Sequence, residues 1–537
     1  MSSVKLESGA KFEPVFVGAG ALAKPLSAAL VGSKAAELAR MSGLRLPVPP
    51  AFVLPTSLCA GVASGDSAAQ DHLRQGVAAG LDWLEASTGR QLGDARTPLF
   101  VSVRSGAEKS MPGMLETILD VGMNRIALHG LIRATGNPRL AYDSWRRFIF
   151  SYAEVVGGAP IQPFEAALAR MILAEQVANE AELDPEALER LVAQFIEIAA
   201  GFGAAPPDDP VEQLCLAARA VYLSWNSPRA VEYRRLNSLE GLQGTAVTVQ
   251  AMVFGNSGGD SGAGVAFSRD PATGAKGLYV DFLIDAQGED VVSGRRTPSD
   301  ATLLAQRLPI VAQQLAEGAR TLEKACADVQ DIEFTVERGQ LYFLQTRAAK
   351  RTPTAALKIA VDLVEEKLID RAQALERIAA IDLGKAGAAR FAQKAESAAK
   401  AVAASPGLAC GRACFTSEQA SAAVKAGPVI LVRRETSTED VAGFALADGV
   451  LTAVGGRTAH AAVVARQMGK ACLVGCHALV IQADQKAARL GDEILRQGDW
   501  LCLDGTTGEI SLGRRDIIVE KPAEYETILR WRQEAEA

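Results

Sequence analysis

His460 is the residue whose neighbours best suit it to covalent chemistry. Residues 450–454 predict a strand, and Gly455 and Gly456 then allow a sharp turn before a helix. Thr458 can cap that helix, so His460 falls in its first turn, where unpaired backbone N–H groups and the helix dipole favour negative charge. An imidazole in this position is a competent nucleophile for a phosphoryl group.

The helix after His460 is rich in small residues. Ala461, Ala462 and Ala465 are expected to leave a low face, which would let a second domain approach His460 closely. The alternative is a partly buried, hydrogen-bonded histidine with no chemical role, because buried polar groups usually find partners.

A pair of carboxylates suggests a metal site. Asp331 and Glu333 are two positions apart in a predicted strand, so both side chains point to one face, where they repel unless a cation lies between them. Mg²⁺ bound to nucleotide phosphates would meet that need. Gln345 lies on the returning strand of a hairpin that turns at residues 337–340, near enough to join them. A solvated acidic strand face is the alternative.

Two cations lie beside flexible segments that could hold phosphate. Arg104 is followed by the Ser/Gly-rich loop in SVRSGAEKSMPGM, and Lys34 follows Gly32 at the start of a helix. Arginine contacts phosphate in a bidentate way, and glycines let backbone amides approach an anion. Together with the carboxylates, these residues predict a nucleoside triphosphate site that uses Mg²⁺.

The pattern of elements indicates several domains of mixed α/β and α+β type. Residues 101–123 predict a strand, a loop and then a helix, and residues 130–235 predict mainly helices. Strands follow Gly244, and an alanine- and charge-rich stretch at residues 354–405 favours helix throughout and is interpreted as a connector. Alternating strands and helices over the next 110 or so residues predict a small α/β domain, followed by a short terminal helix.

Composition narrows the class of protein. The net charge of −7 argues against a nucleic-acid partner, and no apolar run is long enough to span a membrane. The N-terminus lacks the apolar core of a signal peptide, so a cytoplasmic location is expected. Eight cysteines are too sparse for a disulfide framework, and the spacing of Cys410/Cys414 and Cys472/Cys476 is wide for zinc, so buried free thiols are expected.

Several long stretches resemble one family. GGRTAHAAVVAR resembles the phosphohistidine signature of the phosphoenolpyruvate-utilising enzymes, while SVRSGAEKSMPGMLETIL, GNPRLAYDSWRRF, VQAMVFGN, GVAFSRDPATG and DIEFTVERGQLYFLQTR resemble the nucleotide-binding half of the pyruvate, phosphate dikinase family. The resemblance implies an ATP-grasp-like domain (1–350), a helical linker (351–404), a swivelling phosphohistidine α/β domain (405–515) and a C-terminal helix (516–537).

The resemblance also implies residue roles. His460 would carry the phosphoryl group beside Thr458, and Arg147 would face the incoming histidine domain. The residues implied to contact ATP or its Mg²⁺ are Lys34, Arg104, Met252, Val253, Asp331, Glu333 and Gln345. The histidine would first take a pyrophosphoryl group from ATP, and inorganic phosphate would then remove the outer phosphoryl group.

Three departures from the family pattern leave the function open. The family's GGKG is GSKA here, from Gly32 to Ala35, and Glu108 replaces an arginine near the phosphates. The family's pyruvate-binding barrel needs about 250 residues and is not expected within these 537 residues. We therefore expect an autophosphorylating phosphotransferase whose acceptor is pyruvate on a separate subunit or another small molecule. A non-catalytic, nucleotide-binding regulator and a fragment of a longer dikinase are the alternatives.

Overall fold

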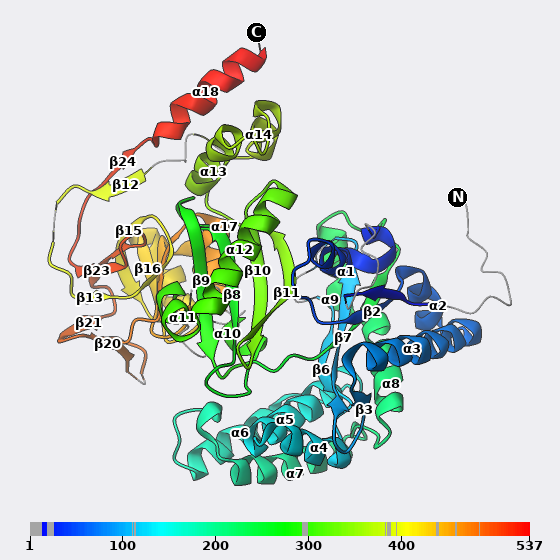
Figure 1. Cartoon of the computed structure of the whole chain (residues 1–537). Helices are drawn as coiled ribbons and strands as arrows, with labels where there is room; N and C mark the ends of the chain where they lie inside the picture. Colours follow the sequence, from blue (N-terminus) through cyan, green and yellow to red (C-terminus); the bar gives the residue numbers. More distant parts are fainter. Residues whose placement is uncertain are drawn as a thin grey trace. The chain divides into compact units, whose positions relative to one another are not determined.

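The structure is a computed structural model that describes residues 13–18, 26–109, 111, 114–292, 299–381, 383, 388–393, 395–436, 440–456, 459–482 and 484–536. The chain forms two compact units (Figure 1). The first contains Met1–Val253 and Tyr342–Gln345, and the second contains Phe254–Leu341 and Thr346–Ala537. The multidomain α/β class expected from the sequence is confirmed.

A five-stranded antiparallel sheet forms the centre of the first unit. Its strands are, in spatial order, β1 (Val15–Val17), β2 (Ala51–Leu54), β7 (Thr245–Ala251), β5 (Val101–Ala107) and β6 (Thr117–Val121). Helices α1 (Ala28–Gly43), α3 (Ser67–Thr88) and α8 (Pro210–Ser224) pack against it, and α2 (Cys59–Ser64) packs against α3 and α8. β2 and β7 are buried along their whole length. The short strands β3 (Gln91–Leu92) and β4 (Pro98–Leu99) pair beside this sheet.

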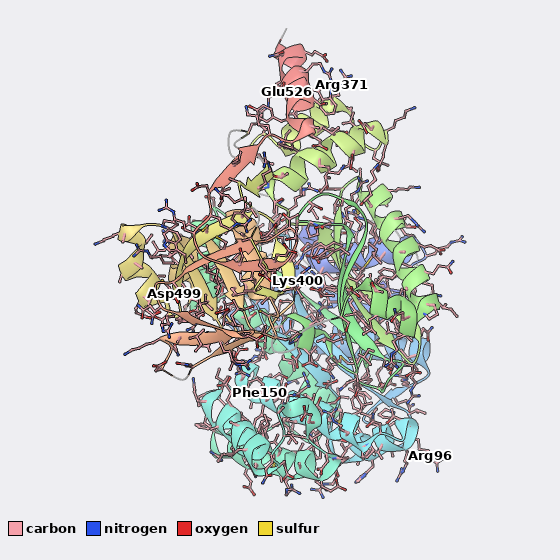
Figure 2. The ribbon with its side chains drawn as sticks, turned by 90° about the vertical axis from the view of Figure 1, so that its left-hand side faces the viewer. Arg96, Phe150, Arg371, Lys400, Asp499 and Glu526 are labelled. Atoms are coloured by element: carbon pink, nitrogen blue, oxygen red, sulfur yellow. The ribbon has the colours of Figure 1, made fainter. Side chains whose placement is uncertain are left out.

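The predicted helical region of the first unit is confirmed. Its further helices are α4 (Arg125–Thr135), α5 (Pro138–Val155), α6 (Gln162–Ala174), α7 (Pro185–Gly201) and α9 (Pro228–Leu236). Asn137, Asp184 and Ser227 cap α5, α7 and α9, each before a proline at the first helical position. The capping side chain accepts a hydrogen bond from a backbone N–H in the first turn, and the proline holds φ near its helical value. The local sequence therefore fixes where these helices begin. Phe150 of α5, labelled in Figure 2, meets Phe164 edge to face.

The helix predicted after the loop at residues 101–123 is wrong. That segment forms β6, which pairs antiparallel with β5 through an irregular register between Val101 and Val103. Ile118 and Val121 are fully buried in this sheet. Pairing with the buried strand β5 therefore outweighed the short apolar pattern that had predicted a helix.

A four-stranded sheet in the order β11, β10, β8, β9 lies in the second unit, except for Tyr342–Gln345 of β11, which belong to the first unit. Its strands are β8 (Gly262–Arg269), β9 (Lys276–Ile284), β10 (Gln330–Glu337) and β11 (Gln340–Ala348). The predicted hairpin between β10 and β11 is confirmed, and Arg338 and Gly339 make its turn with positive φ angles of 49° and 75°. Three helices accompany this sheet: α10 (Gly288–Val292), α11 (Ala301–Arg307) and α12 (Pro309–Cys326).

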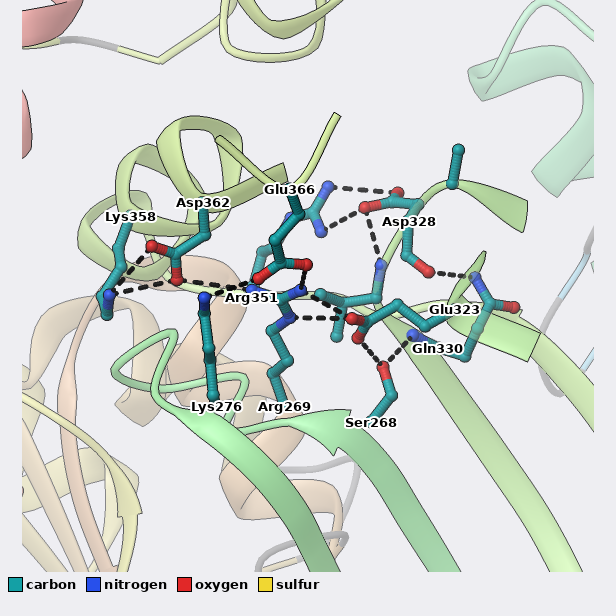
Figure 3. A network of polar contacts seen from close by, with 12 residues as sticks. Ser268, Arg269, Lys276, Glu323, Asp328, Gln330, Arg351, Lys358, Asp362 and Glu366 are labelled. Atoms are coloured by element: carbon teal, nitrogen blue, oxygen red, sulfur yellow. Dashed lines mark hydrogen bonds and ion pairs between the residues drawn. The ribbon is translucent and has the colours of Figure 1, made fainter. Parts of the chain in front are cut away.

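A buried arginine attaches helix α13 (Pro353–Glu365) to this sheet (Figure 3). Nη2 of Arg269 lies 2.6 Å from Glu323 of α12 and 2.6 Å from Glu366, the residue after α13. Nη1 lies 3.3 Å from Asp362 of α13. Because Arg269 is only 3% exposed, these charge-assisted contacts are shielded from water and fix both helices to the end of β8.

The alanine-rich stretch is helical only in its first half. Helix α14 (Arg371–Arg377) follows α13, and helix α18 (Ala523–Glu536) packs against both. Arg371 bridges α14 to Glu534 of α18, and Figure 2 labels it near Glu526. In its second half the described residues instead form the strands Ala388–Phe391, Ala399–Lys400 and Val402–Ser405. The helix predicted there is therefore wrong, because sheet pairing outweighed the helix propensity of alanine.

An eight-stranded mixed sheet carries the region of His460. Its strands, in spatial order, are β13 (Ala399–Lys400), β23 (Glu509–Leu512), β22 (Trp500–Asp504), β15 (Leu408–Cys414), β16 (Val429–Arg433), β17 (Gly449–Thr452), β18 (Ala471–Val474) and β14 (Val402–Ser405). Its helices are α15 (Ser417–Ala423), α16 (Val441–Leu446) and α17 (His460–Met468). This arrangement confirms the predicted alternation of strands and helices.

Two smaller sheets complete the second unit. One consists of β19 (Leu479–Ile481), β20 (Ala487–Leu490) and β21 (Glu493–Arg496). The other is a two-stranded ribbon of β12 (Ala388–Phe391) and β24 (Ile517–Glu520). Since β12 precedes the eight-stranded sheet in the chain and β24 follows it, the ribbon pairs the two segments that enter and leave that sheet.

Candidate functional site: an anion-binding segment, a carboxylate pair and a histidine

The segment that contains Lys34 lies directly against the end of β5. Gly32 interrupts α1 with a φ of 78° and a ψ of 159°, which a residue with a side chain rarely adopts. The hydroxyl of Ser33 donates to the carbonyl oxygen of Ala107 at 3.0 Å. The GSKA segment and the end of the SVRSGAE segment, predicted separately as phosphate contacts, are therefore adjacent in the first unit.

Arg104 and Gln345 also come together in the first unit. Nη2 of Arg104, in the middle of β5, lies 3.3 Å from Oε1 of Gln345 on β11. These residues are 241 positions apart, so only the folded chain could show the pairing. The amide oxygen of Gln345 has a second lone pair, so this contact still leaves it able to bind a cation.

The remaining predicted nucleotide contacts of the first unit lie at the ends of β5. Met252 and Val253 follow β7 and are half-buried, and the N–H of Met252 donates to the carbonyl of Phe100 at 2.9 Å. Phe100 precedes β5, whereas half-buried Glu108 follows it at the other end, beside the GSKA segment. A strand advances about 3.3 Å per residue, so the two ends are roughly 20 Å or more apart.

Asp331 has a carboxylate oxygen that lacks a hydrogen-bond partner. Its Oδ2 accepts from Nε of Arg347 at 2.8 Å, whereas Oδ1 is buried without a donor. Burial raises the pKa of Asp331, and the charge of Arg347 opposes that rise. Glu333 lies two residues along β10 on the same face, opposite the buried Ile332.

This environment meets the needs of a hard divalent cation, which takes oxygen ligands and supplies the positive charge that an unpartnered carboxylate oxygen lacks. In the part of the chain that the structure describes, no three acidic, histidine or cysteine side chains gather as a complete metal site. A cation bound here would therefore need further oxygen ligands, such as phosphates or water.

Arg147 is held by a buried ion pair within helix α5. Its Nε lies 2.9 Å from Oδ2 of Asp143, while Nη2 of Arg146 lies 2.6 Å from Oδ1 of the same carboxylate. Burial acts to raise the pKa of Asp143, but the charges of Arg147 and then Arg146 outweigh it and hold the pKa well below its usual range. Asp143 therefore fixes the direction in which Arg147 points.

His460 is the first residue of α17, which confirms its place in the first turn of a helix. Ala459 occupies the N-cap position of this helix, and no side chain there accepts a hydrogen bond from the helix. The N-cap role predicted for Thr458 is therefore not confirmed. Thr458 itself lies outside the described residues. The first N–H groups of α17 therefore receive no hydrogen bond from a side chain at the cap, which suits an anion near His460.

The alanines after His460 do not form a docking face. Each of Ala461, Ala462 and Ala465 is 3% exposed or less, and all three lie in the core between α17 and its own sheet. Their small size lets the helix approach the strands closely. The expectation that they admit a second domain was therefore wrong.

Arg466 is a residue that the sequence analysis did not assign, although it ends the histidine motif. Arg466 is 3% exposed, and its guanidinium donates to the carbonyl of Ala404 at 2.6 Å and lies 5.8 Å from the ring centroid of Phe267 on β8. The hydroxyl of Tyr279 on β9 donates to the neighbouring carbonyl of Ala403 at 3.2 Å. These contacts join β14 and α17 to the four-stranded sheet that carries Asp331. An arginine spaced six residues after the histidine was the only signal of this contact in the sequence.

These features describe a class of protein: one chain that joins a region with candidate phosphate contacts to an α/β domain with a histidine at a helix N-terminus. Residues 66–317 and 305–368 match the model of the pyruvate phosphate dikinase AMP/ATP-binding domain, and residues 425–508 match that of the PEP-utilising enzyme mobile domain. The first model alone spans more than half of the chain, and the second contains His460. The chain therefore belongs to the pyruvate, phosphate dikinase family of PEP-utilising enzymes.

Curated relatives agree with this assignment. The chain is 44% identical over 512 residues to pyruvate, phosphate dikinase of Clostridium symbiosum, covering 94% of this chain and 58% of that protein. It is 44% identical over 494 residues to pyruvate, phosphate dikinase 2 of Zea mays, covering 91% and 56%. It is 42% identical over 511 residues to the chloroplastic dikinase 1 of Arabidopsis thaliana, covering 94% and 53%. The chain spans a little over half the length of these relatives. None of the helices in the described residues is long and apolar enough to cross a bilayer.

Proposed function

We propose that this chain is an ATP-dependent phosphotransferase module that phosphorylates its own His460 and passes the phosphoryl group to an acceptor. The observation that carries the proposal is the position of His460 as the first residue of α17, inside the region that matches the mobile domain. A phosphoryl group on the imidazole would lie near free backbone N–H groups and the positive end of a helix dipole. The family match supports ATP as the phosphoryl donor.

In this proposal the nucleotide lies along β5. Met252 and Val253 would contact the base at one end of the strand, and Lys34 and Arg104 would contact phosphates toward the other. The absence of a side chain at Gly32 lets the GSKA backbone lie close to Gly106 at the end of β5, and Gln345 holds the guanidinium of Arg104 in place. Fixed cations of this kind reduce the charge repulsion that opposes attack on a phosphate.

Asp331 and Glu333 are proposed to hold Mg²⁺, with Gln345 as a further oxygen ligand. Bound there, the ion would neutralise phosphate charge as it develops during transfer. The buried, unpartnered Oδ1 of Asp331 supports this role. Arg347 would keep the carboxylate ionised and oriented by its contact to Oδ2.

We propose that the group transferred first is a pyrophosphoryl group. An imidazole nitrogen of His460 attacks the β-phosphorus of ATP, the bond from that phosphorus to the α-phosphate oxygen breaks, and AMP leaves. Inorganic phosphate then takes the outer phosphoryl group as pyrophosphate and leaves phosphohistidine. The family description, which names AMP as well as ATP, supports this sequence. Pyruvate, bound outside this chain's nucleotide-binding and histidine regions, is the proposed acceptor.

Labelled ATP tests the proposal directly. With Mg²⁺ present, label from β-³²P-ATP and from γ-³²P-ATP should both appear in an acid-labile protein adduct. Addition of phosphate should release the γ label as pyrophosphate and leave the β label on the protein. The His460→Ala variant should take up neither label, whereas His477→Ala, which changes an exposed histidine after β18, should behave as the wild type. Equal labelling of His460→Ala and the wild type would refute the proposal.

Glu108 favours a second candidate function. Its carboxylate follows β5 beside the GSKA segment, where it would repel phosphates. A chain that binds nucleotide weakly and regulates a partner would show Mg·ATP binding by calorimetry without any labelled histidine. Labelling of the wild type excludes this alternative.

A further inference from the structure

Two cysteines that are distant in the sequence meet inside the domain that carries His460. Cys410 of β15 and Cys502 of β22 are direct cross-strand partners in an antiparallel ladder, and their sulfur atoms are 2.6 Å apart. Cys410 is 9% exposed and Cys502 is fully buried. The sequence spacing had drawn attention to Cys410 and Cys414, but the fold places Cys502, 92 residues away, against Cys410.

The backbone of this pair suits a disulfide bond. Directly opposed residues of antiparallel strands have Cα atoms about 4.5 or 5.5 Å apart. Disulfide bonds span Cα separations of about 4.4 to 6.8 Å, so neither strand has to move. The sulfur atoms need to approach by only about half an ångström to bond.

We propose that Cys410 and Cys502 are a reversible disulfide modification site, oxidised by low-molecular-weight disulfides such as oxidised glutathione. The Cys410 thiolate attacks one sulfur of glutathione disulfide, forms a mixed disulfide and releases one glutathione thiol. Cys502 then loses its proton and attacks the Cys410 sulfur, which forms the protein disulfide and releases the second glutathione thiol. Two protein thiols are oxidised and one glutathione disulfide is reduced to two thiols.

The surroundings assign the order of the two steps. Cys410 is the less buried residue of the two, and its sulfur accepts the backbone N–H of Arg515 at 3.2 Å. Burial, and then the hydrogen bond and charge of Cys410, raise the pKa of Cys502 to about 12. Cys502 is therefore a poor first nucleophile, but its position against Cys410 makes it the resolving thiol.

Oxidation would change the contacts of the segment that leads out of the domain. The Cys502 thiol donates to the carbonyl of Gly513 at 3.1 Å, and a disulfide has no proton to donate. Gly513 and Arg515 lie just before β24, the strand that pairs with β12. The disulfide would thus release Gly513 where the ribbon begins, while it links β15 to β22.

Mass spectrometry of the 537-residue chain tests this site. Folded protein incubated with oxidised glutathione should yield a peptide pair joined through Cys410 and Cys502, and dithiothreitol should separate it. Cys502→Ser should instead retain glutathione on Cys410, and Cys410→Ser should react much more slowly. Cys414→Ser, which changes a buried thiol on the same strand, should form the disulfide as the wild type does.

A thermal measurement on the wild type avoids dependence on the variants' folding. The disulfide closes a long loop and removes freedom from the unfolded chain, so oxidised protein should unfold at a Tm several degrees higher than reduced protein. The inference is overturned if folded wild-type protein keeps all its thiols under conditions that oxidise a small dithiol. It is equally overturned if oxidation links other cysteines.

Discussion

Gly32 lies so close to the backbone of Gly106 that no side chain fits on Gly32. A carbon atom added to Gly32 would lie 2.0 Å from the carbonyl oxygen of Gly106. This contact sets the GSKA segment against the end of β5 and so positions two segments assigned to phosphate binding. The glycine that remains of the family's glycine-rich motif is therefore the one that the packing requires.

Gly32→Ala should destabilise the protein and weaken nucleotide binding. The added methyl group meets backbone that cannot yield, and the φ of 78° is itself unfavourable, so we expect a loss of about 2–4 kcal/mol in the free energy of unfolding. Gly89→Ala is the matched control, because Gly89 has a φ of 66° with open space around it and should lose only about 1 kcal/mol. Urea denaturation and ATP titration measure both effects. Equal losses in the two variants would contradict the argument from packing.

Asp331→Asn should weaken ATP binding only when Mg²⁺ is present. The amide keeps the shape of the side chain and can accept from Arg347, but it removes the charge that attracts the cation. We expect Mg·ATP affinity to fall at least tenfold, about 1.4 kcal/mol, with a smaller change for ATP in EDTA. Glu337→Gln, at the far end of the same strand, should leave both affinities unchanged. Calorimetric titration measures these values, and equal loss with and without Mg²⁺ would argue against a metal role.

Arg269→Ala should be among the most destabilising substitutions in the second unit. It leaves Glu323, Asp362 and Glu366 without the buried cation that they share, which we expect to cost about 3–5 kcal/mol. Arg371→Ala is the control: it also removes an ion pair between helices, but Arg371 and Glu534 are 60% and 52% exposed. That pair should contribute less than about 1 kcal/mol. Chemical denaturation compares the two, and similar losses would show that the network in Figure 3 contributes little.

Asp143 should give α5 a stability that depends on pH. Its pKa is lower in the folded than in the unfolded chain, so its contribution is complete above the unfolded value of about 3.9 and is lost as pH falls through the folded value. Asp143→Asn should cost about 3 kcal/mol at pH 7, because Arg146 and Arg147 lose their buried partner. The difference between variant and wild type should shrink below pH 4. Urea denaturation at pH 7 and at a series of values down to about pH 2 measures it, and a constant difference across the series would show that the carboxylate charge is not the cause.

Local signals predicted much of the fold correctly. Proline after a capping residue marks the start of α5, α7 and α9, and alternation with a glycine turn marks the hairpin of β10 and β11. These local signals failed for segments whose structure depends on pairing with another strand. The segment that forms β6 and the alanine-rich residues after Ala388 both have a composition compatible with helix, yet sheet pairing made them strands.

The sequence by itself determined the family, the motif that presents His460 at a helix start and the alternation that places Asp331 and Glu333 on one face, because these depend on residue types only a few positions apart. Only the tertiary structure decided that Gln345 holds Arg104, that one oxygen of Asp331 is left without a partner and that Cys410 faces Cys502. Each of these depends on which strands become neighbours and which atoms lose water. The folding of the whole chain sets both, and no short stretch of residues encodes them.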